Sequence, residues 1–325
     1  MKQIKLMLVC GCAFFFLHTN AQLTNAYKDT VKKAEQLYYS KEYDRSAKTY
    51  SKAFALNGGK ATQDDRYNAA CSWALAGEKD SAFFHLLKAA RDNKYDNYSH
   101  ITMDSDLNSL HDDARWNEVL AIVTKNKEAV EANYIKPVVA ILDTVYIEDQ
   151  RYRRDIVQLI KDSGMQSQVV QRQLKLMDEA DSVNLEKVTK ILDEYGWLGY
   201  DKVGRMGALT IFLVIQHSPL PVQQKYLPMM REAVAKKQAH PANLALLEDR
   251  VALREGRKQI YGSQVATDTT TGKNFLLPLE DPDNVDARRA SVGLGPLAEY
   301  LKSFNVEWDV EDYKKQLAEK ETKKE

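Results

Sequence analysis

The chain has little cysteine, little histidine and no excess of charge of either sign. Three cysteines and six histidines occur in 325 residues, and 46 lysines and arginines balance 46 aspartates and glutamates. A chain without net charge gives no electrostatic reason to bind nucleic acid or an anionic membrane. So few histidines and cysteines also leave few ligands for a metal site. We therefore expect no nucleic-acid partner, no metal and no other cofactor.

Long apolar runs are also missing, except near the N-terminus. Two lysines and then an apolar stretch over residues 6–17 occur there. The stretch has the length of a signal-peptide core and is too short to span a membrane. We predict a signal peptide over residues 1–21, cleaved after Ala21, and an exported protein that is periplasmic or secreted and has no transmembrane segment. Lipidation at Cys12 is an alternative, but the most apolar residues follow that cysteine, whereas a lipoprotein signal has them before it.

Removal of the signal peptide would leave Cys71 as the single thiol. One thiol cannot form an internal disulfide, and a reactive one would be a liability outside the cell. Because Cys71 lies in an apolar stretch, we expect it to be buried and structural.

Two segments in the first third of the chain repeat one pattern at a spacing of 36 residues. Small residues stand where two helices would cross, and a bulky residue stands between them. The matching positions are Ala34, Leu37, Ser46, Tyr50 and Ala53 in the first segment and Ala70, Trp73, Ala82, Leu86 and Ala89 in the second. The pattern resembles the tetratricopeptide (TPR) repeat, a helical hairpin of about 34 residues.

A segment with Asp104, Asp106, Leu107, Leu110 and Trp116 resembles the cap at the end of such an array. We therefore expect a TPR-like domain with a cap over residues 22–128. The resemblance implies a groove that binds a protein or peptide partner.

The rest of the chain predicts a second, α-rich domain over residues 129–305 and a charged tail over 306–325. Helical periodicity marks seven segments: 138–148, 149–162, 165–179, 183–194, 203–217, 221–237 and 241–255. The pair Asp181-Ser182 has the composition of a helix start. Two strand candidates, 259–266 and 274–279, flank a Thr-Thr-Thr-Gly turn and predict a β-hairpin. A short helix near 296–304 follows, so the predicted fold class is mainly α with one small hairpin.

Residues 203–217 are the most informative stretch of this domain. The run from Leu209 to Ile215 is apolar on every face, so a helix here must be buried on all sides. It ends in Gln216 and His217, which cost free energy in an interior unless they form hydrogen bonds. The end of this helix therefore lies either in a buried polar network or at a pocket.

Other polar residues of the domain are candidates for the same site. His217 is the candidate catalytic base or acid, and Asp249 is the candidate that orients it. Arginines are suited to holding an anionic group. The candidate ligand-binding residues are Gln216, Arg250, Gln259, Tyr261, Gln264, Arg288, Arg289, Asp149 and Arg153. The structural alternative is an ion pair between Asp249 and an arginine, a core histidine and glutamines that bond within the hairpin.

Several short blocks of this domain resemble a known family. They are Tyr195-Gly196-Trp197, Gln216-His217, Asp249-Arg250, the Gln-Ile-Tyr-Gly-Ser-Gln block at 259–264 and the Arg-Arg-Ala-Ser-Val-Gly-Leu block at 288–294. Over roughly residues 135–305 the chain resembles DUF6624, an uncharacterised bacterial domain family. Because that family has no assigned activity, the resemblance implies domain limits and candidate residues but no reaction.

Three functions remain open on this basis. Binding or scaffolding, with a protein or peptide in the TPR-like groove and a polar or anionic small ligand in the second domain, is favoured. A cell-envelope or secreted hydrolase or transferase that uses His217 is the alternative. Neither a Gly-x-Ser-x-Gly elbow nor a His-Glu-x-x-His pair supports catalysis. A purely structural envelope protein is the third possibility.

Overall fold

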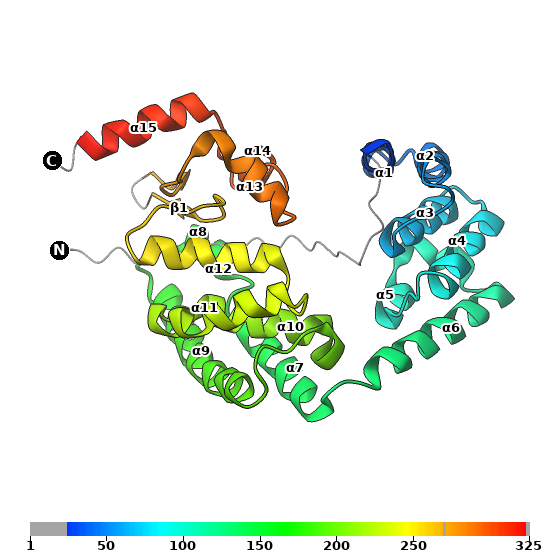
Figure 1. The fold of residues 1–325 in the computed structure, drawn as a ribbon, viewed down its shortest axis with the longest axis horizontal. Helices are drawn as coiled ribbons and strands as arrows, with labels where there is room; N and C mark the ends of the chain where they lie inside the picture. The colour runs from blue at the N-terminus through cyan, green and yellow to red at the C-terminus, as the bar shows by residue number, and fades with distance from the viewer. Residues whose placement is uncertain (1–24, 269–270, 323–325) are drawn as a thin grey trace. The chain divides into compact units, whose positions relative to one another are not determined.

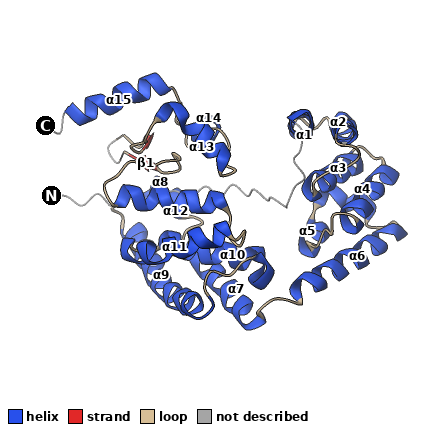
Figure 2. Cartoon of the chain, in the orientation of Figure 1, coloured by secondary structure: helices blue, strands red, loops and turns tan. Residues whose placement is uncertain are grey.

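The structure, a computed structural model, describes residues 25–268 and 271–322. The predicted signal peptide, residues 1–21, lies outside the described residues. The fold is mainly α with one small antiparallel hairpin, as the sequence predicts (Figure 2). The described chain divides into two compact units, which we call the N-terminal unit (25–133) and the C-terminal unit (134–322). None of the described helices combines the length and the apolar character that a membrane crossing requires.

The N-terminal unit consists of paired helices. Two helical hairpins are followed by two short helices and one longer helix (Figure 1). These elements are α1 (Asn25–Tyr39), α2 (Tyr43–Leu56), α3 (Gln63–Leu75), α4 (Lys79–Arg91), α5 (Tyr98–Met103), the 3-10 helix η1 (Ser105–Leu110) and α6 (Ala114–Glu131).

Small residues allow the helices of each hairpin to approach closely. Ala34 and Ser46 in the first hairpin, and Ala70 and Ala82 in the second, are fully buried. The Ser46 hydroxyl donates to the Ala34 carbonyl at 2.8 Å, so the one serine in this set is satisfied at the crossing. Such contacts let a repeat pattern of small residues specify helix pairing.

The segment predicted as a cap covers the second hairpin. Leu107, Leu110 and Trp116 are buried in one cluster with Leu86. The Asp104 carboxylate accepts from the backbone N–H of Asp106 and so caps η1.

The C-terminal unit is built around one apolar helix. Its helical part comprises α7 (Lys136–Arg151), α8 (Ile156–Ser163), α9 (Gln168–Tyr195), α10 (Tyr200–His217), α11 (Leu220–Ala235) and α12 (Pro241–Arg254). Helix α10 contacts α7, α9, α11 and α12. The prediction of a helix buried on all sides over 209–215 is confirmed for residues 210–215, whereas Leu209 is half-buried.

Three local predictions in this unit were wrong. Segments 165–179 and 183–194 form the single helix α9, and Asp181-Ser182 lies inside it. These two side chains do not cap a helix start, because Asp181 accepts from Arg153 and the Ser182 hydroxyl donates to the carbonyl of Asp178. Asp149 lies in the last turn of α7, and the next helix starts only at Ile156. Helix α10 starts before residue 203 and is interrupted at Gly204, whose φ of 69° is not helical.

The last part of the C-terminal unit has its own small core. It contains strands β1 (Val265–Thr267) and β2 (Asn274–Leu276), the 3-10 helix η2 (Pro282–Asn284) and helices α13 (Val285–Ser291), α14 (Leu297–Lys302) and α15 (Val310–Thr322). The strands pair antiparallel with Val265 opposite Leu276. They are shorter than predicted, because side chains rather than a continuous ladder hold residues 259–264.

Residues predicted as a charged tail also belong to this core. Val306, Trp308 and Tyr313 pack against the cluster around Leu297. The Tyr313 hydroxyl accepts from the backbone N–H of Leu279 at 2.7 Å. This contact could not be predicted from a sequence rich in lysine and glutamate, because its apolar residues are few and widely spaced.

Candidate functional site

The predicted site residues fall into two polar groups in the C-terminal unit. The first group consists of His217, Asp149 and Arg153 together with Asp181, and we call it the His217 cluster. Asp249 and most of the other candidates form the second, which we call the Asp249 network.

The centre of the His217 cluster is a histidine–carboxylate pair. His217 Nδ1 lies 3.0 Å from Asp149 Oδ1. The Asp149 side chain is 2% exposed and that of His217 is 10% exposed. Arg153 donates to Asp149 Oδ1 at 3.1 Å and to Asp181 Oδ2 at 2.5 Å. A neutral imidazole that donates its Nδ1 hydrogen to Asp149 carries its basic lone pair on Nε2.

The partners of Asp149 keep this buried carboxyl ionised. Burial raises the pKa of Asp149, but the hydrogen bond to His217 and the charges of His217 and Arg153 outweigh that effect. The amide of Gln150 donates a further hydrogen bond. The pKa of Asp149 therefore lies below its ordinary value, and the carboxylate is available to stabilise an imidazolium.

A cavity of about 610 Å³ opens beside this pair. Its walls come from α7, α9, α12 and the end of α10 with the turn that follows it. The residues that line it are Asp149, Asp178, Asp181, Ser182, Asn184, Leu185, Val214, His217, Ser218, Pro219, Leu220 and Arg254.

Asn184 is one of the lining residues that the sequence prediction missed. It is 1% exposed, and neither its amide oxygen nor its amide nitrogen has a hydrogen-bond partner among the described residues. An unsatisfied buried amide costs free energy, so it calls for a functional explanation. Asn184 precedes Val188 and Ile191 by four and seven residues, on the apolar stripe of α9. A polar residue on such a stripe is the signal that could have revealed it.

Arg254 also lines the cavity without having been predicted. One guanidinium nitrogen donates to the carbonyl of Ser218 at 2.7 Å. Partial burial of the side chain lowers the pKa of Arg254, although the residue as a whole is exposed.

Asp249 does not orient His217, since Asp149 occupies that position. The Asp249 carboxylate instead accepts from the backbone N–H groups of Ile260, Tyr261 and Ser263 at 2.6–2.9 Å. The structural alternative predicted an arginine as the partner of this aspartate, but these donors are backbone N–H groups. Burial raises the pKa of Asp249, and the three backbone donors counter part of that rise. Asp249 therefore fixes the segment after α12.

The predicted glutamines and Arg250 complete the Asp249 network. Arg250 donates to the carbonyl of Gln216 and to the Gln264 side chain. Gln259 donates to the carbonyls of Gln264 and Leu277 and accepts from the N–H of Gln264. These bonds tie residues 259–264 to α10 and to Leu277, the residue that follows β2.

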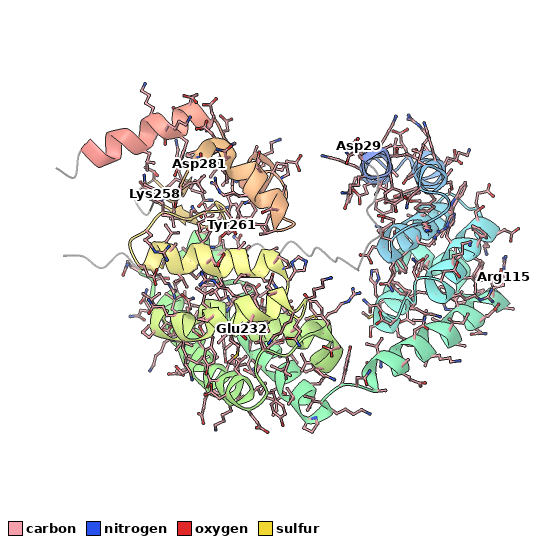
Figure 3. All side chains as sticks on the ribbon, viewed as in Figure 1. Asp29, Arg115, Glu232, Lys258, Tyr261 and Asp281 are labelled. Carbon is pink, nitrogen blue, oxygen red and sulfur yellow. The ribbon has the colours of Figure 1, made fainter. Side chains whose placement is uncertain are left out.

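Arg288 and Arg289 hold the same segment from α13. Arg288 donates to the carbonyl of Ile260, and Arg289 donates to the carbonyl of Tyr261. Figure 3 labels Tyr261 and Asp281 in this region, and Arg288 also bonds to Asp281. These arginines act on the protein's own backbone, so the structure gives them a positioning role.

The N-terminal unit contains a second cavity, of about 520 Å³. Aromatic and acidic side chains dominate its walls. The lining residues are Glu35, Tyr38, Tyr39, Tyr50, Tyr67, Asn68, Cys71, His100, Met103, Asp104, Ser105 and Asp106.

One group of possible metal ligands among the described residues lies in this second cavity. Cys71, Asp104 and Asp106 bring ligand atoms within 4.8 Å of one another. Burial and the charge of Asp104 raise the pKa of the Cys71 thiol, so its protonated form is favoured. The hydroxyls of Tyr67 and Tyr38 donate to Asp104 and Asp106. The carboxylates are thus held by neutral donors, an arrangement that suits an organic cation as well as a metal.

Comparison with known proteins identifies the C-terminal part of the chain. Residues 143–311 match the family described as "Family of unknown function (DUF6624)". No curated protein and no solved structure was found to match the chain.

Proposed function

Because the chain belongs to the DUF6624 family, whose function is unknown, we propose a function from the geometry of its own residues: the C-terminal unit binds a small polar ligand in the cavity beside His217. The observation that carries this proposal is the unsatisfied Asn184 amide. A ligand that accepts from its nitrogen and donates to its oxygen would remove the cost of burying it.

A ligand screen tests this proposal. We expect some polar metabolite to raise the melting temperature of the purified protein, and Asn184→Leu to abolish that rise. Gln168→Leu is the matched control, because it changes an exposed amide on the same helix. If Asn184→Leu and the wild type respond equally to every ligand that binds, the cavity is not the binding site.

A second candidate function is acid–base catalysis in the same cavity. It is favoured by the His217–Asp149 pair, in which a buried carboxylate can stabilise the imidazolium formed when His217 takes a proton from water or from a substrate hydroxyl. We expect His217→Gln to abolish turnover of a bound substrate while leaving its binding within about threefold of wild type. Turnover that survives this substitution would exclude the mechanism.

For the N-terminal unit, we propose that the two hairpins are TPR-like and bind a basic peptide segment. The second cavity contains three carboxylates among tyrosine rings and no lysine or arginine. An arginine side chain can stack on such rings and bond to the carboxylates. Tyr39 and Met103 are 81% and 79% exposed at this cavity and offer apolar contact area.

Labelled peptides test the N-terminal proposal. An arginine peptide should bind more tightly than the same peptide with neutral citrulline, and Asp106→Asn should reduce the difference. Asp112→Asn, an exposed acidic residue outside the cavity, is the control. Equal binding of the two peptides would contradict the proposal.

A location outside the cytoplasm, periplasmic or secreted, is proposed on the N-terminal sequence alone.

A further inference from the structure

The wall of the cavity beside His217 carries charged groups of both signs that form no ion pair among the described residues. Arg254 and Asp178 are exposed at this cavity, and among the described residues neither forms an ion pair. The remaining charged groups, Asp149, Asp181 and Arg153, already pair with one another and with His217. The unpaired cation comes from α12 and the unpaired carboxylate from α9, so a ligand can meet both charges from within the cavity.

Arg254 offers a site for a carboxylate. In the part of the chain that the structure describes, the Ser218 carbonyl is the one acceptor of a hydrogen bond from Arg254, so its other N–H groups can bond to a ligand. A guanidinium can donate two parallel hydrogen bonds to a carboxylate, and this pairing strengthens when water is excluded. A ligand carboxylate would supply the negative charge that the surrounding protein does not.

Helix α9 offers a site for an ammonium group. Asp178, Asp181 and Asn184 follow one another at intervals of three residues, so they lie along one side of the helix. Asp181 Oδ1 is buried and has no hydrogen-bond partner within residues 25–268 and 271–322, although Oδ2 accepts from Arg153. An ammonium group has three donors and no acceptor, which matches Asp178, Asp181 Oδ1 and the Asn184 oxygen.

We propose that the ligand of this cavity is a compact zwitterion, an α-amino acid or a molecule with the same pairing of carboxylate and ammonium groups. The carboxylate binds Arg254 and the ammonium group binds the α9 wall formed by Asp178, Asp181 and Asn184. This inference rests on the proposed binding function, and it narrows the ligand to one chemical class. With about 610 Å³ available, the cavity can also hold the side chain of the amino acid.

Calorimetric titration of the full protein with matched ligands tests the inference. The panel consists of individual amino acids, their carboxamides, which lack the negative charge, and their N-acetyl derivatives, which lack the positive charge. We expect at least one free amino acid to bind, and either blocking group to weaken its binding by about tenfold or more. This comparison uses the wild-type protein and does not depend on the folding of a variant.

Variants then assign the two ends of the ligand. Arg254→Met should weaken binding of the free amino acid but leave the weak binding of its carboxamide unchanged. Asp178→Asn should weaken binding of the free amino acid but leave the weak binding of its N-acetyl derivative unchanged. Arg257→Met, which removes an exposed arginine near the end of α12, should bind like the wild type.

The outcomes separate this inference from the proposed function. If neutral polyols or dicarboxylates bind in an Asn184-dependent manner and no zwitterion does, the inference is overturned and the binding function stands. If blocked and free amino acids bind equally, the inference is likewise wrong. If no class of ligand binds, both proposals fail.

Discussion

His217 Nδ1 and Asp149 Oδ1 lie 3.0 Å apart, although 68 residues separate them in the chain. The two side chains come from the ends of α10 and α7, helices that pack against each other. This contact joins the apolar helix to the cavity, so its loss should affect both stability and binding.

Replacing Asp149 by asparagine should destabilise the C-terminal unit in a pH-dependent manner. The substitution leaves Arg153 and His217 without their shared carboxylate, and breaking such a buried pair costs about 3 kcal/mol. The pKa of Asp149 is lowered in the folded protein. Its contribution is therefore fully present above the unfolded value of about 3.9, and it is lost as the pH falls through the lower folded value.

Melting temperatures of wild type and Asp149→Asn, measured from neutral to acidic pH, check this prediction. The gap between the two proteins should be widest near neutral pH and should close in acid. The exposed Asp162→Asn control should show no gap. Parallel curves over the whole range would mean that the ionised carboxylate does not stabilise the fold.

Replacing Asp249 by alanine should loosen the segment after α12. Three backbone N–H groups would lose their acceptor, and each buried unsatisfied donor costs about 1–3 kcal/mol. Hydrogen exchange should become faster at Ile260, Tyr261 and Ser263, and Asp249→Asn should have a smaller effect because it keeps one acceptor oxygen. Unchanged exchange at these amides would contradict the positioning role of Asp249.

Replacing Gly204 by alanine should destabilise the start of α10. Its φ of 69° and ψ of 176° form a conformation that side chains disfavour, and the added Cβ would lie 3.1 Å from the Tyr134 hydroxyl oxygen. We expect a loss of about 2 kcal/mol in the free energy of unfolding. Gly295→Ala, where a Cβ meets no atom within 4 Å, should be close to neutral. Equal stability of the two variants would show that α10 can straighten at Gly204.

Replacing Asn184 by leucine should stabilise the protein without ligand. The substitution removes two unsatisfied polar atoms from a buried position, which should gain about 1–2 kcal/mol. Thermal unfolding of the ligand-free proteins measures the gain. A lower melting temperature for Asn184→Leu would mean that burial of the Asn184 amide does not destabilise the ligand-free protein.

The predictions from sequence were most accurate where structure depends on local pattern. The small residues at 34, 46, 70 and 82 lie at helix crossings, and the apolar run before Gln216 is surrounded by protein. The family resemblance over 135–305 agrees with the match at 143–311. Side-chain size and periodicity act over a few residues, so they can be read directly from the chain.

Local pattern could not identify the partner of His217. The sequence predicted Asp249 as the residue that orients His217 and Asp149 only as a ligand-binding residue, whereas Asp149 is the partner. The choice depends on how α7, α10 and α12 are rotated against one another, which a packed core sets through contacts between distant residues.

By itself, the sequence determined that the chain is mainly α, that small residues recur where the first helices pair and that one apolar helix is buried. Tertiary structure alone decided that Asp149 pairs with His217, that Asp249 holds a backbone segment and that Asn184 and Arg254 meet at a cavity. The reason is that hydrophobic periodicity fixes which face of a helix is buried, whereas the identity of the groups that meet there depends on the packing of all the helices together.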